Sequence, residues 1–413
     1  MRHQSSKSSK KLLNIYILLI AAWIFDFQSE GEGLGLAIQS IFLAWHVIVT
    51  VLFIIHDKER TLVVRGFAPF AVAVSLFALT GLISGRLQGQ DYYAMLRHTF
   101  TIFIYLSATY TTIRICLVLG SEKIITPLLW LCFFYTTSTI FIETLLFGKF
   151  DINTVRYQIQ GASSVAALAL APLLLVYPAT MIQWMTVAAT MGILFLTVTR
   201  TYIIVLAAQF ALLIPFSHRI FSAKFILQIG IVSAFLFSLI FLVPSISERW
   251  VDRFFVTNKF DGLDPTLLTR QSEWNYMWET LLSTPTSSLL GSGIAAKTQY
   301  SLDVSLGGLN DTSSSVGFGH NNYLSLLFIS GFIGGLPLLL IQIWQGFIGA
   351  RQFVKTIKLK NQAPFSLSWG VCIVIGYLAM NIFAGTFGHR GFSLWYGFVA
   401  QVEKSRYDPY PRR

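Results

Sequence analysis

Residues 321–348 read NNYLSLLFISGFIGGLPLLLIQIWQGFI and contain no Asp, Glu, Lys, Arg or His. About 20 apolar residues are enough for a helix to cross the hydrocarbon layer of a membrane. Apolar runs of similar character recur along most of the chain. This stretch therefore predicts a membrane-spanning helix, and its repetition predicts a protein built from many such helices.

The composition of the whole chain supports this prediction. Of 413 residues, 54% are hydrophobic, 15% are aromatic and only 12% are charged, and the mean hydropathy is +0.63. A soluble domain carries about 25% charged residues, and it keeps a large shell of surface exposed to water. The composition thus excludes soluble, disordered and disulfide-rich secreted proteins. Cys116, Cys132 and Cys372 lie inside apolar runs, so we expect buried free thiols.

The apolar runs predict an all-α polytopic membrane protein with about twelve transmembrane helices. Prolines inside these runs are compatible with membrane helices, because neighbouring helices satisfy the freed backbone groups. The predicted spans lie near residues 12–27, 33–55, 62–84, 98–119, 124–147, 161–177, 180–198, 201–216, 225–244, 321–348, 366–386 and 389–402.

The distribution of Lys and Arg predicts the orientation of these spans. With the N-terminus in the cytoplasm, 19 of the 30 basic residues fall in cytoplasmic segments. Such an excess is the usual mark of the cytoplasmic side, so we expect both termini to be cytoplasmic. The net charge of +11 is therefore a topology signal spread over one membrane face, and we expect no nucleic-acid partner.

The chain divides into three predicted regions: nine spans in residues 1–244, an external loop in 245–320, and three spans with a cytoplasmic tail in 321–413. The loop is rich in aromatic residues, which predicts a folded cap. Within it, Asp264-Pro265 is typical of a helix start. We expect an amphipathic helix of about 17 residues on the outer leaflet, with Trp274 and Trp278 on its apolar face.

Two arginines are candidates for binding an anion. Arg270 lies four residues before Trp274, on the apolar face of the predicted helix, where it could pair with Glu273, a lipid phosphate or an anionic substrate. Arg200 lies in a tight outer hairpin between two spans. It could extend to lipid headgroups, or it could hold a phosphate through its planar guanidinium group.

His320 ends the external loop, with Asn321 and Asn322 following at the start of the next span. These polar residues could simply cap a helix, or His320 could act as a general base. Glu143 and Arg156 could contribute to a site or form a structural pair. No Asp-x-Asp occurs, so we expect no metal.

Several short motifs resemble the O-antigen ligase and Wzy-type polysaccharide polymerase superfamily. The resemblance covers about 120 residues, from near 200 to 340, and includes the large outer loop between the ninth and tenth spans. The matching residues are Gly291 and Gly293, His320-Asn321 with Leu324, Gly331 and Gly334, Arg270 with Trp274, and Thr199-Arg200-Thr201.

The resemblance implies an integral glycosyltransferase of the bacterial inner membrane with its active site on the periplasmic face. Its donor would be a glycan on undecaprenyl diphosphate, transferred without metal or cofactor and with inversion. His320, Arg200 and Arg270 would be catalytic, and both arginines would bind substrate together with Asn321 and Trp274. The acceptor would be another lipid-linked glycan for a polymerase, our first choice, or lipid A–core for a ligase. Other polysaccharide export proteins are possible partners.

Two other classes of protein fit parts of the sequence. A multispan transporter or flippase would show related halves and charges in its spans, whereas this chain concentrates polar residues in one outer loop. A non-catalytic partner of an envelope complex would depend on the loop aromatics rather than on Arg200, Arg270 and His320.

Overall fold

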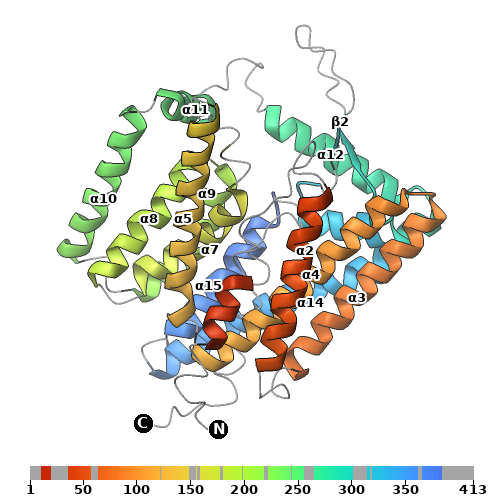
Figure 1. The fold of residues 1–413 in the computed structure, drawn as a ribbon, viewed down its shortest axis with the longest axis horizontal. Helices are drawn as coiled ribbons and strands as arrows, with labels where there is room; N and C mark the ends of the chain where they lie inside the picture. The colour runs from red at the N-terminus through yellow and green to blue at the C-terminus, as the bar shows by residue number, and fades with distance from the viewer. Residues whose placement is uncertain are drawn as a thin grey trace.

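The computed structural model describes most of the chain as a bundle of helices (Figure 1). The described residues are 11–19, 36–56, 64–120, 122–147, 155, 159–176, 180–197, 199–217, 222–242, 244–254, 265–300, 314–316, 319–360 and 365–383.

Residues 11–19 are helical, and the other described elements follow in chain order. They are α2 (Leu36–His56), α3 (Val64–Leu87), α4 (Tyr92–Leu119), α5 (Glu122–Phe147), α7 (Gln160–Leu175), α8 (Met181–Thr197), α9 (Arg200–Leu213), η2 (Ile214–Phe216), α10 (Ala223–Leu242), α11 (Pro244–Phe254), α12 (Pro265–Leu282), α13 (Pro285–Leu290), β1 (Thr298–Tyr300), β2 (Ser314–Val316), α14 (Asn322–Lys360) and α15 (Phe365–Met380).

Helices occupy most of the described residues of the predicted spans, and α7 and α8 are separate helices, as predicted. Helix α15 ends at Met380, before the predicted end of its span at 386. The structure is consistent with an all-α membrane protein. Three described helical segments are long and apolar enough to cross a membrane, namely Phe67–Leu87, Lys123–Ile142 and Asn322–Lys358. The predicted span 389–402 lies outside the described residues.

The outward faces of several helices are apolar. In α2, Ile41, Ile48 and Ile55 repeat every seven residues and are all about 60% exposed. In α10, Ile231 and Phe235 are exposed to a similar degree. Large contiguous apolar surfaces are unfavourable in water but not in lipid, so these faces agree with the membrane prediction.

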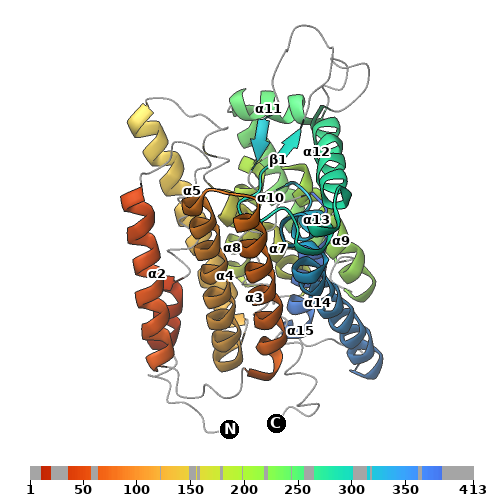
Figure 2. The same ribbon diagram turned by 90° about the vertical axis from the view of Figure 1, so that its right-hand side faces the viewer.

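The described parts of the predicted loop form a cap at one end of the bundle. Figures 1 and 2 show α11, α12 and both strands at this end, which we call the capped end. Strand β1 pairs antiparallel with β2, and Thr298 lies opposite Val316. Helix α12 packs against both β1 and α14. A helix is therefore present where the amphipathic helix is predicted, and it ends at Leu282.

Helix α14 is broken at Gly331, which has φ 60° and ψ −167°. The broken turn receives the loop that follows α13: the amide of Ser292 donates to the Phe328 carbonyl at 2.6 Å, and the amide of Gly293 donates to the Ile329 carbonyl at 3.0 Å. The break therefore exchanges helical hydrogen bonds for bonds to a second segment, so the backbone groups stay satisfied.

Glycines allow this close approach. A Cβ on Gly291 would lie 2.5 Å from the Gly331 amide nitrogen, and a Cβ on Gly331 would overlap the Leu289 carbonyl. Helix α3 joins the same junction, since the Ser330 hydroxyl donates to the Phe77 carbonyl at 2.7 Å. We call this junction the glycine crossing. It fixes the start of α14 to the capped end of α3.

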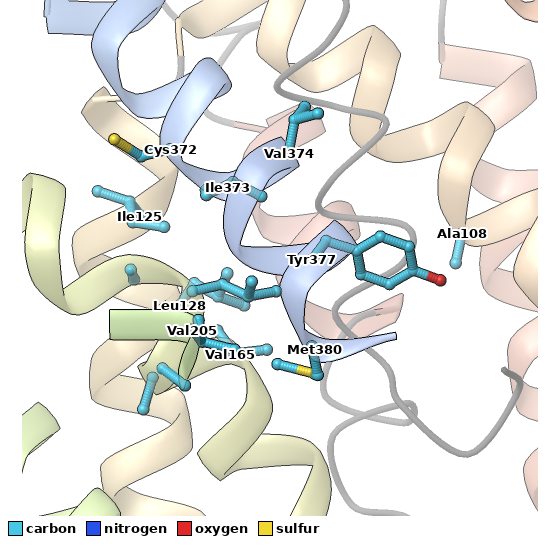
Figure 3. Packing of buried hydrophobic residues seen from close by; sticks show 14 of the residues in the cluster. Ala108, Ile125, Leu128, Val165, Val205, Cys372, Ile373, Val374, Tyr377 and Met380 are labelled. Atoms are coloured by element: carbon cyan, nitrogen blue, oxygen red, sulfur yellow. The ribbon is translucent and has the colours of Figure 1, made fainter. Parts of the chain in front are cut away.

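Helices α7, α9 and α15 form a second packed unit. The Gln209 amide of α9 donates to the carbonyls of Leu168 at 2.8 Å and Cys372 at 3.0 Å, which links all three helices. In Figure 3, Tyr377 points from α15 toward Ala108 of α4. This unit holds α15 in place, and the end of α15 reaches the cap.

Candidate functional site

Glu273 and His320 form a close pair at the capped end. The carboxylate oxygen Oε2 of Glu273 lies 2.9 Å from Nδ1 of His320 and accepts the His320 backbone N–H at 3.1 Å. The Glu273 side chain is fully buried, whereas the His320 side chain is 43% exposed. Because an ionised carboxylate can only accept, Nδ1 carries the hydrogen, and Nε2 can accept a hydrogen bond whenever it carries no proton.

The second carboxylate oxygen of Glu273 is held by strand β1. The Thr298 hydroxyl donates to Oε1 at 2.8 Å, and Thr298 is itself buried. Burial opposes ionisation of Glu273, but the hydrogen bonds and charge of His320, with the Thr298 hydrogen bond, outweigh burial and lower the pKa of Glu273 below its usual 4.5. Glu273 is therefore ionised near neutral pH.

The buried face of α12 differs from the sequence prediction. Met277 and Leu281 are buried on the same side as Glu273, whereas Trp278 is 48% exposed and Leu282 is 52% exposed. These three buried positions follow one another every four residues, which is one helical stripe. The face of α12 that packs against α14 and β1 therefore includes a carboxylate. This carboxylate accepts hydrogen bonds there from His320 and Thr298.

Arg270 and Trp274 lie one turn apart on α12 and contact Phe383, in the turn that follows α15. The Arg270 guanidinium lies over the Phe383 ring, with Cζ 5.6 Å from the ring centre, and the Trp274 and Phe383 ring centres are 6.2 Å apart. Stacking of a cation on an aromatic ring is favourable and restricts the side chain. Arg270 is thereby held on the same helix as Glu273.

Asn321 and Asn322 serve the start of α14 in different ways. Asn321 Oδ1 accepts the Leu324 amide at 3.0 Å, so this oxygen caps the helix. Its substrate-binding role stays a prediction. The backbone N–H of Asn322 donates to the backbone carbonyl of Asn381 at 2.9 Å. This hydrogen bond ties the start of α14 to the turn that follows α15.

Arg200 is half-buried at the first turn of α9, at the capped end. Trp250 of α11 donates to the Phe195 carbonyl at 3.3 Å, which places the end of α8 under the cap. Arg200 follows α8 after a two-residue connection. Tyr202 bonds the Ser163 hydroxyl at 2.8 Å, so the turn that carries Arg200 is anchored to α7.

Arg200 also lies at about the same height in the bundle as the end of α15. Gln209 contacts Cys372, and from there α9 rises nine residues to Arg200, or about 14 Å at 1.5 Å per residue. Helix α15 rises eight residues from Cys372 to Met380, or about 12 Å. The structure thus brings Arg270, Trp274 and His320 together around α12, with Arg200 on the next helix pair at the same end.

Other predicted residues have simpler roles or are not described. His46 Nε2 and the Ser107 hydroxyl are hydrogen-bonded at 2.5 Å in the core, which is a packing role, and all three cysteines are buried, as predicted. Arg156 lies outside the described residues, and only the backbone of Glu143 is described.

The low pKa of Glu273 makes stability depend on pH. The ionised carboxylate stabilises the folded state above the usual pKa of 4.5, and this contribution is lost as the pH falls through the lower folded-state value. We expect the melting temperature in detergent to begin to fall at about pH 5 and to keep falling as the pH is lowered below 4.5. In Glu273→Gln the decrease should be shallower, and equal slopes in both proteins would contradict the assignment.

Sequence reasoning did not identify Glu273 or Thr298 as members of the site. Glu273 was weighed only as a local partner of Arg270, three residues away. One signal was available in the sequence. Glu273 lies four residues before Met277, and therefore on the same face of the helix as this apolar residue.

The fold and this cluster define a mainly helical protein with a polar site at one end of its bundle. No protein-family model matches the chain, and no curated protein matches it significantly.

Proposed function

We propose that the chain is a twelve-span glycosyltransferase of the bacterial inner membrane that transfers a glycan from undecaprenyl diphosphate to an acceptor hydroxyl on the periplasmic face. The observation that carries the proposal is the Glu273–His320 pair, in which Nδ1 is bound to a buried carboxylate while the ring is partly exposed. Arg270, Trp274 and Arg200 at the same end of the bundle support it.

His320 would act as the general base. The acceptor oxygen attacks the anomeric carbon as the bond from that carbon to the diphosphate oxygen breaks. The hydroxyl proton passes to Nε2 of His320, and undecaprenyl diphosphate leaves with the bonding electrons. A single base without a nucleophilic carboxylate gives one displacement, so the anomeric configuration inverts.

The arginines would bind the diphosphate. Negative charge grows on the departing oxygens, and a guanidinium group stabilises it through paired hydrogen bonds without losing its own charge. Arg270 is already restrained by Phe383, and Arg200 by the anchored start of α9. Preorganised donors of this kind are typically worth about 3 kcal/mol in the transition state.

The reaction fits a polymerase, whose acceptor is another lipid-linked glycan, or a ligase, whose acceptor is lipid A–core. We favour the polymerase because the sequence contains no recognisable ligase-specific feature. In either case the protein would have cytoplasmic termini and would work beside other polysaccharide export proteins.

Deletion of the gene followed by complementation tests the proposal. For a polymerase, the deletion strain should carry single repeat units on lipid A–core. For a ligase, long chains should remain on the carrier lipid, with none on the core. Unchanged glycan pools would contradict both enzymatic assignments.

The arginines can be tested in the same strain. Arg270→Ala and Arg200→Ala should each lower product about a hundredfold at normal protein levels, because each removes a donor to the diphosphate. Arg97→Ala is the matched control, since Arg97 is exposed on α4 and lies outside the proposed site. Normal product from both site variants would refute the arginine roles.

A further inference from the structure

We infer that Glu273 is a positioning residue for His320 and that Thr298 fixes the Glu273 carboxylate in turn. This inference rests on the proposed function, because it assigns a purpose to the pair only if His320 is the base. It goes beyond that function by adding two residues that contact neither donor nor acceptor in the proposed reaction.

The Glu273 carboxylate is bound in a way that fixes the histidine. Oε2 accepts two hydrogen bonds from one residue, from the backbone N–H and from Nδ1 of His320. Together they fix both the backbone and the ring plane of the histidine. A surface ion pair would leave the ring free to rotate, so this arrangement holds one orientation.

A carboxylate at position 273 is costly. Glu273 is fully buried, and burying a charge is unfavourable unless hydrogen bonds compensate. An apolar residue would continue the buried stripe of Met277 and Leu281 at lower cost. The carboxylate therefore has a role that packing alone does not explain.

The Glu273 carboxylate would also favour proton transfer to His320. The Glu273 acceptor keeps hydrogen on Nδ1, so the Nε2 lone pair can receive the acceptor proton. The imidazolium that forms then lies 2.9 Å from a negative charge, which stabilises it. Glu273 remains ionised throughout and takes no proton itself.

Thr298 completes the arrangement from the other side. The Thr298 hydroxyl donates to Oε1 of Glu273 at 2.8 Å. Its backbone is held by the pairing of β1 with β2, in which Thr298 lies opposite Val316. The carboxylate is thus bound at both oxygens and cannot turn away from the ring. Removing the hydroxyl should loosen the carboxylate without removing its charge.

Four substitutions separate charge, hydrogen bonding and packing. Glu273→Gln keeps an oxygen that can accept from Nδ1 but removes the charge, whereas Glu273→Leu removes both. Thr298→Val removes the hydroxyl at nearly constant size, whereas Thr298→Ser keeps the hydroxyl and removes only the methyl group. Glu279→Gln is the matched control, because Glu279 is exposed on the same helix.

The first readout is glycan transfer by purified, reconstituted protein with a lipid-linked donor. We expect kcat to fall about tenfold in Glu273→Gln and about a hundredfold in Glu273→Leu, with the KM for donor changed less than about twofold. The kcat of Thr298→Val should be several-fold below that of the wild type, whereas the kcat of Thr298→Ser should be close to the wild-type value. A merely structural role would lower the amount of folded protein without this separation of kcat from KM.

The second readout needs no reaction. Ring-¹⁵N NMR of labelled protein, with His320→Gln used to assign the signal, reports which nitrogen carries the hydrogen. We expect the Nδ1–H form in the wild type and in Glu273→Gln, and a population of the Nε2–H form in Glu273→Leu. If Glu273→Leu does not fold, the kcat of Glu273→Gln decides.

The outcomes distinguish the two proposals. Normal transfer by His320→Ala would overturn the proposed function itself. Loss of transfer in His320→Ala, combined with wild-type kcat in Glu273→Gln and an Nε2–H signal in the wild type, would overturn only the positioning role. Reduced kcat in Glu273→Gln together with an Nδ1–H signal in the wild type would support it.

Discussion

His320→Ala is expected to lower glycan transfer by a factor of about 10² to 10⁴ while the protein still accumulates in the membrane. The ring is 43% exposed, so its removal leaves no large cavity in the core. It does remove the group that accepts the hydroxyl proton in the proposed reaction. The measurement is product chain length in the complemented deletion strain, with the protein quantified in the same membranes.

His56→Ala is the control for this experiment. His56 ends α2, and its Nδ1 bonds only one turn back along its own helix, at 2.7 Å from the Leu52 carbonyl. Its replacement should leave transfer unchanged. Normal product from His320→Ala, or an equal loss from both variants, would refute the role of His320 as base.

The helices could be predicted from sequence because their signal is local. The apolar run around Phe328 and Leu338 needs no partner elsewhere in the chain to predict a helix, and both residues are buried in α14. The start of α12 was predicted in the same way, from Asp264 and Pro265 alone. Membrane helices satisfy their own backbone, so local composition is sufficient.

The polar site could be predicted only in part. Spacing along α12 brought Arg270 and Trp274 together, and the structure agrees. Spacing also suggested Glu273 as a partner of Arg270. In the structure, the carboxylate oxygens of Glu273 accept hydrogen bonds from Thr298, 25 positions away, and His320, 47 positions away. Such partners are set by tertiary packing, which no helical periodicity contains.

The glycines of the site region illustrate the same limit. Gly291 and Gly331 entered the sequence analysis only as parts of a resemblance, without a physical reason for glycine. The reason is contact between segments 40 residues apart, where neither residue has room for a Cβ. Sequence alone marks such positions but does not show what they touch.

Gly331→Ala is expected to be among the most damaging substitutions in the chain. The residue has φ 60° and ψ −167°, a conformation that is essentially open to glycine alone and costs other residues about 1–3 kcal/mol. The added Cβ would also overlap the Leu289 carbonyl, and overpacking of a tight core typically costs a further 1–3 kcal/mol or so. We therefore expect a loss of about 3 kcal/mol or more, measured as a lower melting temperature and reduced accumulation in membranes.

Two other glycines separate the causes of this loss. Gly89 also has a positive φ, of 67°, but nothing lies within 4 Å of a Cβ added there, so Gly89→Ala should show the backbone strain without the overlap. Gly192 lies inside α8 with open space around it, so Gly192→Ala should be neutral or slightly stabilising. If Gly331→Ala were no worse than Gly89→Ala, close packing at the glycine crossing would not be what positions α14. The loop that leads from Gly291 to Thr298 would then need another anchor, and the placement of the Glu273–His320 pair would have to be explained by α12 and the β1–β2 strands alone.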